Sequence, residues 1–126
     1  MRLIFVYGTL KRGFGNYHHL LMRDDVNFVK EAETFPNFTM FNLWGFPGII
    51  RGGKTAIKGE VFEVPDELIK SLDRLEGHPT FYRRQPEVLA DGSQVELYVL
   101  AKPTRYAGYD EVESGEWHKS SNQFSP

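Results

Sequence analysis

The stretch MRLIFVYGTLKRGFG, Met1–Gly15, decides the fold and indicates a binding loop. Its apolar run, residues 3–7, stops abruptly at Gly8. An unbroken apolar run that ends at a glycine is typical of a central strand buried on both faces. The glycine-punctuated turn that follows exposes backbone N–H groups, which many folds use to hold an anionic group of a ligand. We therefore expect a ligand-binding loop at the end of the first strand.

Length and composition describe an ordinary small protein. The chain has 126 residues, a charged fraction of 25% and a formal net charge of −2. No basic excess points to a nucleic acid, and no lysine–arginine cluster points to a membrane surface. Cysteine is absent, which excludes disulfides, thiol nucleophiles and zinc–thiolate sites. The apolar run at residues 3–7 is too short for a signal-peptide core or a membrane span, so we expect a cytoplasmic protein.

Short strands dominate the rest of the pattern. Alternating apolar and polar residues, bounded by turn residues, predict strands over residues 26–34, 38–43, 48–51, 56–64, 82–89 and 94–102. The last two form a hairpin with Asp91-Gly92 at its turn. After Pro103 the periodicity fades. We therefore expect an α+β domain over residues 1–102, with residues 103–126 as a C-terminal extension of the same domain.

Two helices are predicted from capping and periodicity. The clear one covers residues 66–76, with Asp66 as its N-cap and Gly77 as its stop. A short one begins at Asn16, which could cap a turn that carries Leu20, Leu21 and Met22.

The clear helix carries an unusually placed charge, Glu76. At about 100° per residue, Leu68, Leu72 and Leu75 mark an apolar arc, and Glu76 falls inside it. A carboxylate that points toward the core is costly unless it is partnered or neutral, and the helix C-terminus disfavours an anion. Both effects raise its pKa and suit it to accepting and returning protons near neutral pH. The alternative is a last-turn glutamate that frays outward into solvent.

Other candidate sites are weaker. Residues 8–13 have the GxxxxG spacing of a phosphate loop, but Phe14 stands where the lysine is needed. His18 and His19 are adjacent and cannot easily share a metal ion, so no metal site is expected. Asp73 is interpreted as a solvated flank of the helix. No GxSxG nucleophile elbow is present.

Two motifs, VYGTLKRG at residues 6–13 and LDRLEGHPTFYRR at residues 72–84, occur in this order in the chain. Together with GEVFEV at residues 59–64, they resemble the gamma-glutamylcyclotransferase-like superfamily, most closely its gamma-glutamylamine cyclotransferase-like branch. The resemblance covers residues 2–102. It implies a compact mixed β-barrel with one main helix and short flanking helices, and no cofactor.

The resemblance also implies a site. Its motif glutamate matches Glu76 as catalytic base and acid, and its substrate-binding loop and YxR element match Tyr7, Gly8, Thr9, Leu10, Tyr82 and Arg84. The implied reaction cyclises a γ-glutamyl amine or amide to 5-oxoproline and releases the amine. The implied partner is a small-molecule γ-glutamyl substrate, and a monomer or small homo-oligomer is expected.

Several alternatives stay open. The substrate could be a γ-glutamyl dipeptide or a protected biosynthetic intermediate, and the protein could be a non-catalytic module that binds a metabolite. Arg84 could form a structural ion pair instead of binding substrate. Trp44, Phe46 and Trp117 could line a leaving-group pocket, although core packing is the expected role of the first two.

Overall fold

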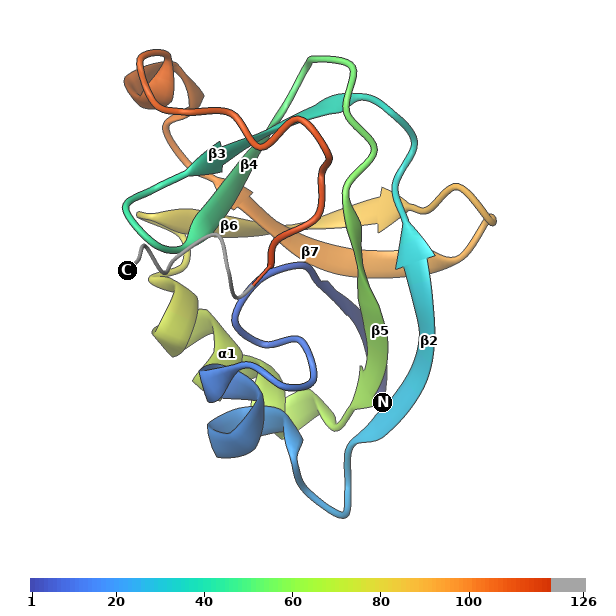
Figure 1. Ribbon diagram of the computed structural model, residues 1–126. Helices are drawn as coiled ribbons and strands as arrows, with labels where there is room; N and C mark the ends of the chain where they lie inside the picture. The colour runs from blue at the N-terminus through green and yellow to red at the C-terminus, as the bar shows by residue number, and fades with distance from the viewer. Residues whose placement is uncertain (119–126) are drawn as a thin grey trace.

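The computed structural model describes residues 1–118, which form a mixed α+β fold (Figure 1). The larger sheet has five strands in the order β2-β5-β1-β7-β6. Their bounds are Asn27–Glu33 for β2, Lys58–Val64 for β5, Arg2–Val6 for β1, Gln94–Leu100 for β7 and Tyr82–Val88 for β6. A second sheet pairs β3 (Phe38–Asn42) with β4 (Pro47–Arg51). The helix α1 spans Asp66–Glu76.

The first strand is the middle of the larger sheet, as predicted. β1 pairs antiparallel with β5 on one side and parallel with β7 on the other. Its side chains alternate between two buried clusters: Ile4 and Val6 pack with residues of α1, and Phe5 packs with residues of β3 and β4. Burial on both faces explains why this strand is continuously apolar.

The sheets are not closed into a barrel, so the expected barrel architecture is wrong. Within residues 1–118, β2 and β6 are the two edges of the larger sheet, and β3 and β4 pair only with each other. Both edge strands carry features that oppose further pairing. The register of β2 shifts between Phe28 and Lys30, and β6 contains Pro86, which has no N–H to donate.

The ends of α1 are partly as predicted. Gly77 ends the helix in a left-handed conformation with φ 66°, which glycine adopts without steric cost. The predicted N-cap is wrong: Pro65 occupies the N-cap position and Asp66 is the first helical residue. The Asp66 carboxylate instead lies 3.4 Å from the N-terminal ammonium of Met1, which ties the helix start to β1.

The predicted short helix is a single π-helical turn, η1, over Tyr17–Leu21. Asn16 precedes it as predicted, but its side chain makes no capping hydrogen bond. No helix in the described part of the chain is long and apolar enough to cross a membrane.

Residues 103–118 cover the smaller sheet and then approach the loop after β1 (Figure 1). They begin with a 3₁₀ turn, η2, over Pro103–Tyr106, and Glu111 forms a β-bridge with Phe41. Trp117 is fully buried in the cluster that contains Phe5, and its carbonyl accepts a hydrogen bond from Lys11 Nζ at 2.7 Å. The remaining residues of the expected extension, 119–126, lie outside the described residues.

The two tryptophans provide a test of this packing. Trp117 is 0% exposed and Trp44 is 85% exposed. We expect Trp117→Ala to lower the free energy of unfolding by about 3–5 kcal/mol, because it removes a large buried side chain. The exposed counterpart, Trp44→Ala, should change it by less than about 0.5 kcal/mol. Urea denaturation measures both, and equal effects would contradict the placement of the C-terminal segment in the core.

Candidate active site

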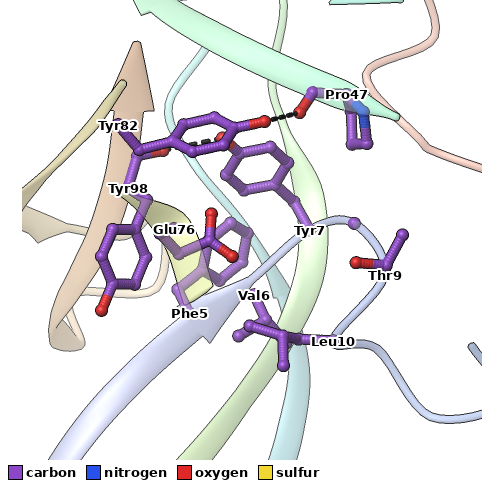
Figure 2. A pocket seen from close by; sticks show the side chains of 10 residues that line it. Phe5, Val6, Tyr7, Thr9, Leu10, Pro47, Glu76, Tyr82 and Tyr98 are labelled. Atoms are coloured by element: carbon purple, nitrogen blue, oxygen red, sulfur yellow. Dashed lines mark hydrogen bonds between the residues drawn. The ribbon is translucent and has the colours of Figure 1, made fainter. Parts of the chain in front are cut away.

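A small pocket of about 40 Å³ lies where β1 ends. It collects residues from β1, from the loop that follows, from α1, from β7 and from the starts of β4 and β6 (Figure 2). The lining residues are Phe5, Val6, Tyr7, Gly8, Thr9, Leu10, Pro47, Glu76, Tyr82 and Tyr98. The structure therefore brings together six of the seven residues named from the sequence, and Arg84 is the exception.

The loop after β1 lines this pocket with Gly8, Thr9 and Leu10. Within residues 1–118, the N–H groups of Gly8, Thr9 and Leu10 donate to no other residue. Two hydrogen bonds fix the loop: Lys11 N–H donates to the Gly8 carbonyl at 3.0 Å within the loop, and Asn16 Nδ2 donates to Thr9 Oγ1 at 2.7 Å. A cluster of free N–H groups on a fixed loop is suited to an anionic group or a polarised oxygen.

Gly8 is required by packing against the smaller sheet. A Cβ atom at this position would lie 2.7 Å from Cγ of Pro47, the first residue of β4. The missing side chain therefore lets the loop lie directly against β4.

Glu76 supplies the titratable group of the pocket. It lies at the end of α1, and Figure 2 shows its carboxylate directed into the pocket among the tyrosine rings. Burial raises its pKa from the ordinary value of 4.5 to about 7. Within the described chain, its side chain accepts no hydrogen bond that would stabilise the anion. The carboxylate is thus able to hold or release a proton near neutral pH.

The inward direction of Glu76 confirms its predicted position on the apolar face of the helix. The predicted position of Leu75 on that face is wrong. Leu75 is 43% exposed. Ile69 is buried with Leu68 and Leu72, which moves the centre of the buried arc toward Glu76 and leaves Leu75 outside its edge.

Two tyrosine hydroxyls are fixed at the pocket wall by backbone acceptors. Tyr7 donates to the Tyr98 carbonyl at 2.7 Å, and Tyr82 donates to the Pro47 carbonyl at 2.5 Å (Figure 2). Burial, with a contribution from the nearby negative charge of Glu76, raises the pKa of both phenols above their ordinary range. Both therefore stay neutral and form a rigid wall.

Arg84 lies outside the pocket and forms the structural ion pair that was the alternative to substrate binding. Its guanidinium pairs with the Asp73 carboxylate and lies 3.4 Å from Glu96 Oε2. Asp73 also accepts a hydrogen bond from the Tyr98 hydroxyl at 2.7 Å. Arg84 thereby joins β6 to α1, and Asp73 joins α1 to Tyr98 in the pocket wall.

The interpretation of Asp73 as a solvated flank is wrong, because its carboxylate is partly buried in this network. Although burial acts to raise its pKa, the hydrogen bonds from Arg84 and Tyr98 lower the pKa of Asp73 below its ordinary value. Asp73 therefore remains an anion that anchors the helix.

The locations of the two tryptophans and Phe46 differ from those expected from the sequence. Trp44 and Phe46 are 85% and 38% exposed, so core packing is the wrong role for both. They lie in the turn between β3 and β4, where Trp44 has φ 64° and Gly45 has φ 107°. This tight turn directs both side chains away from the sheet. Trp117 is the core residue of the three.

Four pocket residues were not identified from the sequence: Phe5, Val6, Pro47 and Tyr98. The first two precede the loop in β1, and adjacency to it was the available signal. Pro47 and Tyr98 reach the pocket through tertiary packing that no local pattern marks. Within residues 1–118, no group of three or more His, Cys, Asp or Glu side chains is placed to hold a metal ion.

Comparison with known proteins assigns the chain to a family. The family model described as "Gamma-glutamyl cyclotransferase, AIG2-like" matches residues 4–119. The chain belongs to this family, which confirms the resemblance carried by the two motifs.

Individual relatives cover nearly the whole chain. A protein of Methanocaldococcus jannaschii named "Putative gamma-glutamylcyclotransferase" is 34% identical over 82% of this chain and 86% of its own. A protein of the same description from Vibrio cholerae is 30% identical over 91% and 94%. The crystal structure of an AIG2-like protein from Mus musculus superposes with a TM-score of 0.80 over 95% of this chain and 90% of that one. At 23% identity, that last likeness concerns the fold.

The raised pKa of Glu76 predicts a pH-dependent cost to stability. In the unfolded chain this carboxyl ionises near its ordinary pKa of 4.5, and in the folded protein near 7. Folded protein therefore binds the extra proton between these values, and its free energy of unfolding falls as the pH rises from about 4.5 to about 7. Glu76→Gln lacks this ionisation. We expect the variant to gain stability relative to the parent protein across that window and to hold the gain above it.

Thermal unfolding of both proteins at pH 5 and pH 8 measures the difference. Glu67→Gln, an exposed acid in the first turn of the same helix, is the matched control. A stability difference for Glu76→Gln that does not change between the two pH values would contradict a buried carboxyl at this position.

Proposed function

We propose that the protein is a cofactor-independent gamma-glutamylcyclotransferase that converts a γ-glutamyl amine or amide to 5-oxoproline. The observation that carries the proposal is a desolvated carboxylate, Glu76, that shares a small pocket with the free N–H groups of Gly8, Thr9 and Leu10. Family membership supports the same reaction class.

The reaction forms one C–N bond and breaks another. The α-amine nitrogen of the glutamyl group attacks its own γ-carbonyl carbon, which closes a five-membered ring. The bond between that carbon and the leaving nitrogen then breaks. In the net reaction the α-ammonium gives up two protons, and the released amine leaves as an ammonium ion that carries both. No water or co-reactant is consumed.

Glu76 has the properties that this proton transfer needs. As an anion it accepts a proton from the α-ammonium and frees the nitrogen for attack; as an acid it returns a proton to the leaving nitrogen. A pKa of about 7 makes both steps accessible at neutral pH. Because attack is intramolecular, a pocket that holds the glutamyl group folded supplies much of the rate enhancement.

The loop N–H groups are proposed to bind either the glutamyl α-carboxylate or the oxygen of the attacked carbonyl, which becomes an oxyanion. Tyr7 and Tyr82 are proposed to form the pocket wall that packs against the glutamyl group. Their hydroxyl protons are already donated to backbone carbonyls, so their proposed role is to shape the pocket.

Isosteric replacement of the glutamate tests the proposal. With a γ-glutamyl amide, we expect Glu76→Gln to lower kcat for 5-oxoproline release by about 10²–10⁴-fold, because it removes the general base and acid. For the parent enzyme, kcat/KM should rise with pH through about 7, as Glu76 ionises in the free enzyme. Glu67→Gln should retain both the rate and the pH profile.

Equal release of 5-oxoproline by the parent and by Glu76→Gln would remove Glu76 from the mechanism. Tight binding of 5-oxoproline without turnover of any γ-glutamyl compound would instead identify a non-catalytic metabolite-binding module.

A further inference from the structure

A second, larger hollow adjoins the pocket on the outer side of Glu76. It has a volume of about 360 Å³ and shares Glu76 and Tyr82 with the inner pocket. Its remaining lining residues are Asn16, Phe46, Arg74, Leu75, Gly77 and Phe81. At this volume, it falls in the range of small-molecule sites.

The lining of this outer hollow is mixed, and three of its apolar side chains are exposed. Phe46, Leu75 and Phe81 are 38%, 43% and 38% exposed, although residues of this kind are ordinarily buried. The rings of Phe46 and Phe81 lie 6.3 Å apart and also line a further hollow of about 290 Å³ that contains Trp44. Exposed apolar side chains that gather beside a titratable group indicate a binding surface.

Apart from Glu76, the charged residues that line the two hollows are positive. The outer hollow is lined by Arg74 and the further one by Arg105, and no other acidic residue lines either. Among residues 1–118, neither arginine forms an ion pair. A positively charged ligand group finds no carboxylate here other than Glu76, whereas a carboxylate finds an available guanidinium.

Glu76 fixes which part of a substrate reaches the outer hollow. In the proposed reaction it protonates the leaving nitrogen, so that nitrogen must lie beside it. The glutamyl group occupies the inner pocket at the loop. The remainder of the substrate then extends to the other space that Glu76 lines, the outer hollow.

We propose that the outer hollow binds the leaving group, and that this group is an α-amino acid with an aromatic side chain. Its ring packs against Phe46 and Phe81, and its carboxylate pairs with Arg74. The proposal rests on the proposed cyclotransferase function and names the substrate class within it: a γ-glutamyl aromatic amino acid rather than the γ-glutamyl derivative of a basic amine.

A panel of four γ-glutamyl compounds separates these features. γ-Glutamyl-phenylalanine has both the ring and the carboxylate, γ-glutamyl-alanine lacks the ring, γ-glutamyl-phenethylamine lacks the carboxylate, and γ-glutamyl-putrescine carries a cation. We expect kcat/KM for the phenylalanine compound to exceed that of each other compound by about ten-fold or more, since one such contact corresponds to about that factor.

Variants assign the preference to residues. Arg74→Gln should lower kcat/KM for γ-glutamyl-phenylalanine about ten-fold more than for γ-glutamyl-phenethylamine. Phe46→Ala should lower it more for γ-glutamyl-phenylalanine than for γ-glutamyl-alanine. The matched controls are Lys70→Gln, an exposed cation one turn earlier on α1, and Phe28→Ala, which is 39% exposed on β2. Neither control residue lines the pocket or the hollows.

The outcomes distinguish the two proposals. Turnover of the whole panel at similar kcat/KM, or equal effects of Arg74→Gln and Lys70→Gln, would overturn the leaving-group site and leave the cyclotransferase function standing. A preference for γ-glutamyl-putrescine would overturn the aromatic amino acid as leaving group. Turnover of none of the four compounds would contradict the cyclotransferase function itself, and the leaving-group site with it.

Discussion

The burial of β1 on both faces is the constraint on which the candidate site depends. Hydrogen bonding to β5 and β7 fixes the strand laterally, and the two apolar clusters fix it from above and below. The loop that leaves this strand at Tyr7 therefore starts from a strand that is restrained on both sides and both faces. The helix that carries Glu76 packs against one of the same two clusters. The loop and Glu76 are thus both positioned by the same core. Such fixed positions suit a reaction that needs a proton carrier at a constant distance from a binding loop.

Two acids of the same helix, three residues apart, have opposite electrostatic environments. Asp73 receives hydrogen bonds from Arg84 and Tyr98, which lower its pKa and keep it ionised. Glu76 is half-buried and has no such partners, and the loss of solvent around its carboxyl raises its pKa to about 7. The environment keeps Asp73 ionised as an anchor of α1 and leaves Glu76 able to hold or release a proton near neutral pH, a divergence also found in enzymes that use paired carboxyl groups in different roles. The ion pair of Arg84 supports the site indirectly, because it holds α1 and the Tyr98 wall in place.

Local patterns were sufficient for the features that depend on neighbours in the sequence. The central strand, the loop at Gly8, the helix that stops at Gly77 and the inward direction of Glu76 each follow from apolar runs, helical periodicity or glycine chemistry. Features set by distant residues could not be read this way. Which strands pair, and therefore that the two sheets stay open, depends on contacts between distant residues. Asp66 is not the N-cap because Pro65 occupies that position.

The same distinction applies within the site. The partners of Asp73 come from two other elements of the fold, β6 and β7. The sequence pattern of its own helix therefore predicted a solvated side chain. Trp44 and Phe46 have large aromatic side chains of the kind expected in a core, but the turn between β3 and β4 directs them outward. Phe46 thereby lines the outer hollow together with Glu76, and Trp44 lines the further hollow beside it.

A crystal structure of the protein with bound 5-oxoproline tests the central claim most directly. We expect the ring in the pocket at the end of β1, with one of its oxygens within about 3.2 Å of a backbone N–H of the Gly8–Leu10 loop. The carboxyl group of Glu76 should lie within hydrogen-bond distance of the product. Binding of 5-oxoproline at another location, with this pocket left empty, would contradict the account.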